Sequence, residues 1–436
     1  MPCHGVPPQS PDHAARTRRP PPLHAAIPPE LRHHGTLRLP APLADPQLAA
    51  RLLELAAPNT HLDEAVCFLG GGTRDHHVPA IVDLVAHAAG HQPVGPASPQ
   101  PLLQTVFELQ TLFAALMDLR AATAPFADGP SALAAAIRAA AAATGRSEAV
   151  LARSLNPRYR AVARTLLAPS LGVHEVGYHG GITRPGDVDR LLTPSAACLV
   201  VEAPNYFGCL EDLPALARAA HRHGAWLIVK ADPIACGIIR PPGSAGADAA
   251  VADAQPLGFH PTFGTPALGL LACRPELSHA VPGWRVERRH DTFAPVGQTT
   301  ACIPADRLVR PAAYLAAVGG EGLAHVATLS MATAHEAHRR ITSLDGFQPR
   351  FRAPFFCEFA IECHAEPGDV ADALLDSNLL GALPLGTHYP EMDHCVLFAA
   401  TERRTPADVG LLHHTLEFLA EMGGGGAFAP DLGNDG

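Results

Sequence analysis

The chain has 436 residues, 47% of them hydrophobic, and a formal net charge of −10. That length supports a large domain and a smaller one, each with a core of its own. The acidic chain has no basic cluster that would bind nucleic acid, no apolar run long enough to cross a bilayer, and no apolar signal region in its Pro-rich N-terminus. We therefore expect a folded cytoplasmic protein whose partners are neither nucleic acid nor membrane.

The first predicted elements lie between two tails. Residues 1–26 and 423–436 are rich in Pro or Gly, and we expect both to be disordered. The segments 44–56 and 131–144 have helical periodicity, and the second is almost pure alanine. We predict a helix for each.

Strand patterns begin in the middle of the chain. "AACLVVEAP" (196–204) and "AWLIVKAD" (225–232) are typical of buried strands, and the segment 213–224 between them is typical of a helix that Gly224 ends. A further strand is expected within 264–274. Strand, helix and strand joined by short turns form a βαβ unit, so the sequence predicts an α/β protein with a mostly parallel central sheet.

The pattern changes in the C-terminal part. Strand-like segments at 349–363 and 394–402 alternate with helical segments at 369–378 and 406–421, which indicates a smaller α+β domain. The predicted divisions are a disordered tail (1–26), a large domain with an N-terminal extension (27–304), linking helices with a C-terminal small domain (305–422), and a second disordered tail (423–436).

The cysteines and histidines give no clear metal signature. The ten cysteines are scattered without a C-x-x-C pair, which favours buried thiols in a reducing compartment over a zinc ribbon. In "FLGGGTRDHHVPA" (68–80), the glycines suit a phosphate and Asp75, His76 and His77 suit a metal ion. No phosphate-loop context follows, however, and adjacent histidines point in different directions. We favour a tight turn with helix-capping groups and predict no metal.

A better anion site lies at the start of the alanine-rich helix. "FADGPSALAAAIRAA" (126–140) places Gly129 and Ser131 where free backbone N–H groups, a hydroxyl and the helix dipole converge. That arrangement suits the phosphate of a cofactor. The alternative is that Ser131 only caps the helix, which is the commonest role of serine there.

Asp232 closes a predicted parallel strand, at the end where α/β proteins bind ligands. An aspartate in this place either pairs with a protonated pyridine nitrogen or forms an Asp-Pro turn. Lys230, the only lysine of the chain, lies two residues earlier and therefore on the same face of the strand. Its side chain is either an imine-forming amine or one half of a buried ion pair.

Seven motifs, in the same order, resemble subunit 1 of the two-subunit glycine decarboxylase, the P-protein of the glycine cleavage system. They are "FLGGGTRDHHVPAIVD", "FELQTLFAAL", "FADGPSALAAA", "NPRYRAVARTLL", "APNYFGCLEDLPAL", "DPIACGIIRPPGSAGAD" and "LGALPLGTHYPE…TERRTPADV". The similarity runs from about Ile27 to Glu421, which is nearly the whole chain.

The resemblance implies a fold type I transferase of the pyridoxal phosphate (PLP) class, with a mixed seven-stranded sheet in its large domain. It also implies an oligomer with a homologous subunit 2, whose lysine carries the PLP, and a transient partner, the lipoyl H-protein, which accepts the aminomethylene group of glycine. In that fold the imine-forming lysine follows the pyridine-binding aspartate on a later turn. This chain has Gln255 there and His260 nearby, so the resemblance gives Lys230 no such role and this chain no catalytic residue.

Two sets of residues are candidates for the site under this resemblance. The cofactor-site candidates are Gly129, Ser131, Asn205 and Asp232, and the candidates that line a site shared with the partner are Asp75, His76 and Asp128.

The sequence departs from the family where polar and aromatic groups would face that shared site. Arg74 stands where the family usually has an aromatic residue, Ala127 where it has tyrosine, and "QPVGPA" (92–97) lacks a tyrosine and a glutamate. Core patterning is kept. The leading hypothesis is a subunit 1 that pairs with a PLP-carrying partner. The alternative is a catalytically inert homologue, kept as a structural or regulatory subunit or recruited to a biosynthetic pathway.

Overall fold

The computed structural model describes residues 27–33, 38–62, 64–168, 170–261, 268–297 and 302–422. The two tails predicted to be disordered lie outside these ranges. The chain divides into two compact units, residues 1–60 and 61–436. The described part of the first unit contains the 3-10 helix η3 (Pro29–Leu31) and helix α1 (Asp45–Ala56), which confirms the helix predicted over 44–56. The domain boundary at 304/305 stays a prediction.

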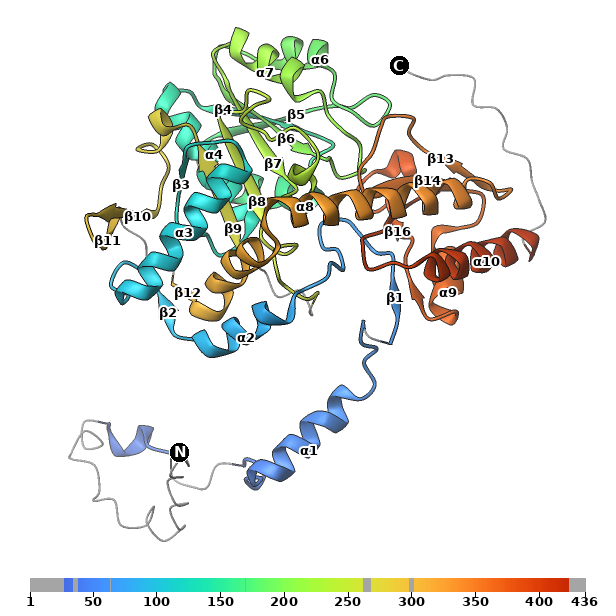
Figure 1. Cartoon of the computed structure of the whole chain (residues 1–436), viewed down its shortest axis with the longest axis horizontal. Coiled ribbons are helices and arrows are strands. Elements are labelled where there is room, and N and C mark those ends of the chain that lie inside the picture. Colours follow the sequence, from blue (N-terminus) through green and yellow to red (C-terminus); the bar gives the residue numbers. More distant parts are fainter. Residues whose placement is uncertain are drawn as a thin grey trace. The chain divides into compact units, whose positions relative to one another are not determined.

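A seven-stranded sheet forms the centre of the second unit (Figure 1), in the order β3-β9-β8-β7-β6-β4-β5. Strand β9 runs antiparallel to β8 and β3, and the other neighbours pair in parallel. The strands are β3 (Ala121–Ala122), β4 (Glu148–Ala152), β5 (Gly172–Val176), β6 (Ala196–Ala203), β7 (Trp226–Ala231), β8 (Ala249–Asp253) and β9 (Gly269–Cys273). The predicted α/β class with a mostly parallel sheet is confirmed.

The sheet separates two hydrophobic cores because successive residues of a strand point to opposite faces. Val150 and Leu227 belong to one core, whereas their neighbours Leu151 and Ile228 belong to the other. Helices cover both faces. Those that contribute to the first core include α3 (Gln100–Leu116) and α7 (Leu213–Arg222), and those that contribute to the second include α4 (Gly129–Thr144) and α5 (Pro157–Leu167).

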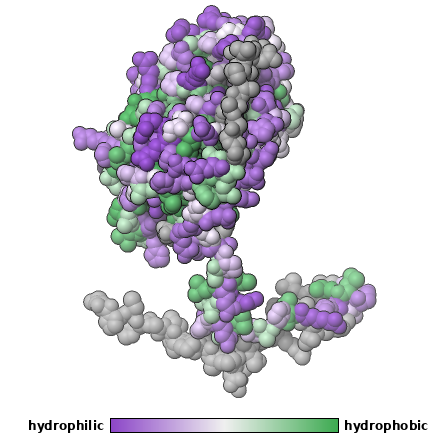
Figure 2. Space-filling model, turned by 90° about the vertical axis from the view of Figure 1, so that its right-hand side faces the viewer, coloured by the Kyte–Doolittle hydropathy of each residue, from purple (hydrophilic) through white to green (hydrophobic). Residues whose placement is uncertain are grey.

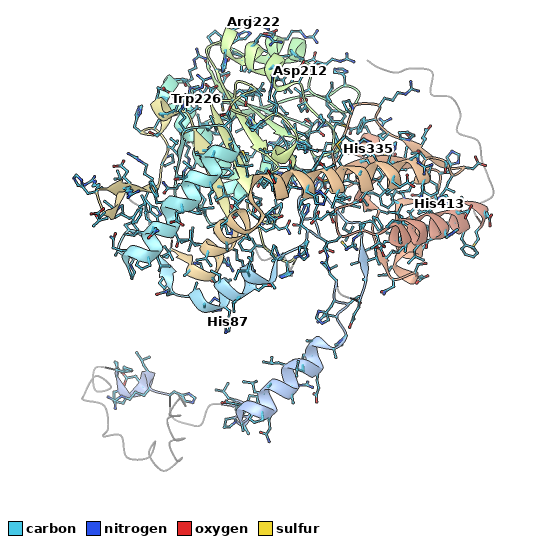
Figure 3. The ribbon with its side chains drawn as sticks, in the orientation of Figure 1. His87, Asp212, Arg222, Trp226, His335 and His413 are labelled. Carbon is cyan, nitrogen blue, oxygen red and sulfur yellow. The ribbon has the colours of Figure 1, made fainter. Side chains whose placement is uncertain are left out.

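The predicted βαβ unit is present. Helix α7 begins after Asp212, whose carboxylate accepts a hydrogen bond from the backbone N–H of Ala215 at 3.0 Å. Gly224, with a φ of 65°, turns the chain from the end of this helix at Arg222 into β7, which begins at Trp226 (Figure 3). The predicted helix over 131–144 is α4, which begins two residues earlier than its periodicity suggested.

The C-terminal part contains an antiparallel sheet of order β13-β14-β17-β16 with two helices, as predicted. Its elements are β13 (Phe347–Pro349), β14 (Glu358–Cys363), α9 (Pro367–Asp376), β15 (Leu379–Leu380), β16 (Leu383–Pro384), η6 (Pro390–Met392), β17 (Cys395–Ala399) and α10 (Pro406–Met422). The short strand β1 (Val66–Cys67) pairs with β15, so the beginning of this unit joins its C-terminal part. Helix α8 (Ala305–Ile341) runs from one part to the other and is broken at Gly319, where φ is 62°.

Smaller elements complete the second unit. They are α2 (Ala80–Ala89), β2 (Pro93–Val94), α6 (Pro185–Leu191), η4 (Ala235–Gly237), η5 (Pro275–Leu277), β10 (Trp284–Arg289), β11 (Thr292–Gly297) and β12 (Ile303–Pro304). The face of this unit seen in Figure 2 is mostly hydrophilic, with hydrophobic side chains scattered over it. None of the described helices combines the length and the hydropathy that a bilayer span requires.

The turn after β6 fits against β14 only because it contains a glycine. Gly208 has a φ of 83°, and its carbonyl accepts a hydrogen bond from the N–H of Phe356 at 3.1 Å. A Cβ at this position would overlap the carbonyl group of Glu358. The turn therefore fixes the loop that follows β6 against the C-terminal part.

We predict that Gly208→Ala lowers the free energy of unfolding by at least about 2 kcal/mol, because it combines a left-handed backbone with a steric overlap. Urea unfolding followed by circular dichroism measures the loss. The matched control is Gly186→Ala in α6, where a Cβ meets nothing within 4 Å, and it should stay within about 1 kcal/mol of wild type. Equal stability of the two variants would contradict the prediction.

Candidate functional site

A cavity of about 410 Å³ lies at the carboxyl ends of β4 and β8. Asp253 is the last residue of β8, and Asn156 and Tyr159 follow β4 at the start of α5. Carboxyl ends of parallel strands meet at one edge of a sheet, which is where α/β proteins bind ligands. The other lining residues are Gly71, Gly72, Thr73, Asp128, Pro130, Arg158, Gln255, Phe259, His260, Pro261, Asp306, Arg307 and Arg310.

Tyr159 and Asp253 form a hydrogen-bonded pair in this lining. The phenol donates to Asp253 Oδ2 at 3.1 Å, and it packs so closely on Gly129 that a Cβ there would overlap it. Burial raises the pKa of Tyr159, and the charge of Asp253 raises it further. Burial and the neighbouring Asp128 also raise the pKa of Asp253, against the opposing charge of Lys230. The phenol therefore remains a donor, and Gly129 provides the space for it.

Asp128 supplies an anion to the start of α4. Its Oδ1 accepts a hydrogen bond from the backbone N–H of Ser131 at 2.7 Å, which makes Asp128 the N-cap of the helix. The positive end of the helix dipole favours a negative charge at this place. The predicted anion site is therefore filled by a carboxylate of the chain itself, and Ser131 takes part through its backbone.

Asp232 follows the last residue of β7, is buried, and forms an ion pair with Arg74. Its Oδ2 lies 2.6 Å from Nη2 of Arg74, and its Oδ1 accepts a hydrogen bond from the N–H of Ile234 at 2.9 Å. Nη1 of Arg74 also contacts Oε2 of Glu358 at 2.7 Å. Burial alone would lower the pKa of Arg74, but the two carboxylates outweigh it and raise that pKa well above its ordinary value. Asp232 is thus paired with a permanent cation.

Lys230 is one half of a buried ion pair. Its Nζ lies 2.5 Å from Oε1 of Glu202 and 5.5 Å from the centre of the Tyr159 ring. Burial would lower the pKa of Lys230, yet the charge of Glu202 outweighs burial and raises it. The side chain is held as an ammonium group, whereas imine formation needs a neutral amine.

Gln255 occupies the place where the resemblance puts the imine-forming lysine, and it holds the backbone of Arg74. Its Oε1 accepts from the N–H of Arg74 at 3.2 Å, and its Nε2 donates to the carbonyl of Arg74 at 2.9 Å. His260 also lines the cavity and pairs with Asp83 at 3.0 Å. The turn that contains Gln255 therefore helps to hold the backbone of Arg74 in place.

Asn205 is buried and does not line the cavity. Its side-chain amide forms hydrogen bonds within the protein. Its Nδ2 donates to the carbonyl of Gly181 at 2.7 Å and to Glu211 at 2.9 Å, and its Oδ1 accepts from the backbone N–H groups of Phe207 and Cys209. These bonds shape the turn that contains Gly208.

Asp75 and His76 hold the loop after β17. Asp75 contacts Arg403 at 2.5 Å and Arg404 at 2.8 Å, and Nδ1 of His76 lies 2.9 Å from Glu402. Both residues are buried, and neither lines the cavity.

Of the seven predicted site residues, only Asp128 lines the cavity, and Asp128 and Ser131 are the only two that a hydrogen bond joins within the described ranges. Sequence reasoning missed Asn156, Arg158, Tyr159 and Asp253. The rule that pointed to Asp232 also applies to Asp253, since it too ends a strand.

The residues around this cavity do not fit PLP. The start of α4 carries the Asp128 carboxylate, which would repel a phosphate group. Asp232 is already paired with Arg74, and the only lysine is an ammonium group bound to Glu202. We therefore derive no step through PLP on this chain. The described residues also contain no group of three His, Cys, Asp or Glu side chains placed to hold a metal ion.

Comparisons with known proteins give one consistent result. The family model of the glycine cleavage system P-protein matches residues 22–294. The chain is 34% identical to the probable glycine dehydrogenase (decarboxylating) subunit 1 of Desulforamulus reducens, over 89% of this chain and 93% of that protein. It is also 34% identical to the protein of the same description from Chlorobium luteolum, over 90% and 94%.

Comparisons with solved structures agree with the sequence comparisons. A crystal structure of glycine decarboxylase (P-protein) of the glycine cleavage system, in inhibitor-bound form, matches with a TM-score of 0.85 and 32% identity, over 95% of this chain and all of that chain. The sphingosine-1-phosphate lyase of Burkholderia pseudomallei matches at 16% identity and a TM-score of 0.71, over 89% and 93%. The fold is therefore the type I fold of PLP-dependent enzymes, as the resemblance implied.

We predict that Arg74→Met lowers the free energy of unfolding by about 3–5 kcal/mol, because it leaves two buried carboxylates without a cation. Adding Asp232→Asn and Glu358→Gln to this variant should recover at least half of the loss in urea unfolding. The control is Arg153→Met, which breaks an exposed pair with Glu391 and should cost less than about 1 kcal/mol. No recovery in the triple variant would show that packing, not charge, sets the cost.

A second prediction concerns Glu211, which is buried and accepts hydrogen bonds from Ser154, Thr183 and Asn205. Burial outweighs these bonds and raises its pKa from 4.5 to about 7. Because the folded state binds this proton more tightly, the group favours folding increasingly as the pH falls from about 7 to 4.5. Wild type should therefore gain about 3 kcal/mol of stability relative to Glu211→Gln between pH 8 and pH 4.5. A gap that stays constant with pH would refute the raised pKa.

Proposed function

Because the chain belongs to the glycine cleavage system P-protein family, we propose that it acts as subunit 1 of a two-subunit glycine dehydrogenase (decarboxylating). Its partner in this proposal is a homologous subunit 2 whose lysine holds the PLP. That complex decarboxylates glycine and passes the aminomethylene group to a lipoyl H-protein. The observation that carries the proposal is the 34% identity to proteins described as subunit 1, which extends over about 90% of this chain.

The side chains of this chain support a division of labour between two subunits. Lys230 is bound to Glu202, and Arg74 holds the aspartate at the end of β7. A chain arranged in this way contributes a scaffold and an interface, and the decarboxylation chemistry falls to the partner. We propose that the two subunits form an obligate oligomer. Its interface would bury about 2,000 Å² or more, as permanent complexes commonly do.

The test is co-expression of this chain with a subunit 2-like chain from the same genome. We expect the two to purify as one complex that exchanges the glycine carboxylate with labelled bicarbonate when lipoyl H-protein is added, whereas each chain alone is inactive. A complex without activity would favour the inert structural or regulatory homologue. A chain that forms no complex and is a stable monomer would contradict both.

A trapping experiment assigns the lysine. After incubation with PLP and reduction by borohydride, peptide mass spectrometry should find the stable adduct on the partner's lysine and none in stoichiometric amount on Lys230 of this chain, because that ammonium group is not a nucleophile. Lys230→Met provides the blank for adventitious labelling. A full adduct at Lys230 would make this chain a PLP enzyme in its own right.

A further inference from the structure

Helix α1 exposes an apolar stripe. Leu48, Leu52 and Leu55 have the i, i+4, i+7 spacing that places side chains on one side of a helix, and they are 46%, 58% and 58% exposed. No residue of α1 is buried. A helix of this length is only marginally stable in water by itself, because most helical stability in proteins comes from packing of the apolar side. The stability of α1 therefore calls for a surface that covers this stripe.

Helix α2 has an exposed apolar stripe of its own. Its buried residues are Val82 and Ala86, and it packs on α8 within the second unit (Figure 1). The exposed side has the spacing i, i+3, i+4, i+7 and contains no charged residue. It consists of Ile81, Leu84, Val85 and Ala88. A helix that is apolar on opposite sides is typical of a buried element, so this side of α2 is also suited to a contact.

The two stripes match in length and in pattern. Helix α1 has 12 residues and α2 has 10, so they are about 18 and 15 Å long at about 1.5 Å per residue. Each helix has a row of apolar residues four positions apart. The rows are Leu48, Leu52 and Ala56 on α1, and Ile81, Val85 and Ala89 on α2. Packing of such a row into the groove beside another is the commonest arrangement of two helices.

A second copy of this chain is the partner that fits both stripes. In a closed two-fold dimer, α1 of each copy contacts α2 of the other, so the same contact forms twice and covers every stripe. A different protein would need a separate matching face for each stripe. A membrane surface fits less well, because interfacial helices are rich in Lys and Arg on the polar side. The charged residues of α1 are Asp45, Arg51 and Glu54, and the last two pair with each other at 3.0 Å.

We propose that two copies of this chain associate by exchanging α1, which docks its leucine stripe on the exposed side of α2 in the other copy. The nine residues 57–65 connect α1 to β1 and can extend to about 30 Å, which suits such an exchange. The contact uses residues of this chain alone, so the proposal does not rest on the proposed function. It involves seven apolar side chains per copy, fewer than a standard interface, so we expect a weak dimer with a Kd on the order of micromolar.

The test is sedimentation velocity of the full chain without any partner subunit, at about 1 to 100 µM. We expect the sedimentation coefficient to rise with concentration from that of a monomer to that of a dimer. Leu52→Asp and Leu84→Asp replace exposed side chains, so both variants should keep the circular dichroism spectrum of wild type, and each should raise the Kd by about tenfold or more. A chain that is monomeric over the whole range, or a dimer that neither variant weakens, would overturn the proposal.

A mixture of the two variants tests the pairing of α1 with α2. Leu84→Asp keeps α1 intact and Leu52→Asp keeps α2 intact, so a mixed dimer retains one of its two contacts, whereas each variant alone retains none. The mixture should therefore associate more strongly than either variant alone, and no gain would show that these helices do not pair.

The matched control is Leu53→Asp. It costs α1 the same helix propensity, but position 53 lies about 100° around the helix from position 52 and outside the stripe. This variant should dimerise like wild type. If Leu53→Asp and Leu52→Asp weaken the dimer equally, the leucine stripe is not the contact.

Discussion

The buried guanidinium group of Arg74 constrains the candidate site more than any other group. It joins Asp232 at the end of β7 to Glu358 at the start of β14, residues that are 158 and 284 positions away from it in the sequence. Charges removed from water are tolerated only when each has a well-placed partner, so this arrangement leaves little freedom for the loop that carries Arg74. The same loop supplies residues 71–73 to the cavity, and Gln255 holds its backbone. One cation thus fixes the cavity wall and the C-terminal part together.

The hydrophobic scaffold does not depend on these charges. Strands β6 and β7 are buried along almost their whole length, and their apolar side chains pack into cores on both faces of the sheet, to which Arg74, Asp232 and Glu358 do not belong. A polar side chain such as that of Arg74 can therefore shape the site while the sheet is retained. The chain accordingly matches the fold of the P-protein with a TM-score of 0.85, while the polar groups around Asp232 bond to one another.

Most of the fold was predictable from the sequence, and most of the site was not. Helices such as α4 and strands such as β7 follow from patterns within a few residues, and the strand-end rule identified Asp232. The same rule does not say which strand end lines a cavity and which is occupied by side chains of the protein. That depends on side chains such as Arg74 and Arg403, which reach partners 158 to 328 positions away and leave no periodic signal in the sequence. Tyr159 is a further case, because its contact with Gly129 appears only when α5 packs on α4.

The carboxylates at the edge of the cavity make it unsuitable for the phosphate of a cofactor. Lys230 and Glu202 neutralise each other, and Arg74 is already shared by two carboxylates. No internal cation among the described residues pairs with Asp253, and Asp128 is compensated only in part by the helix dipole. The wall formed by Asp128 and Asp253 is therefore negative, which repels a dianion. The mismatch with a phosphate therefore follows from carboxylates of the chain itself, which sit at the end of β8 and at the start of α4.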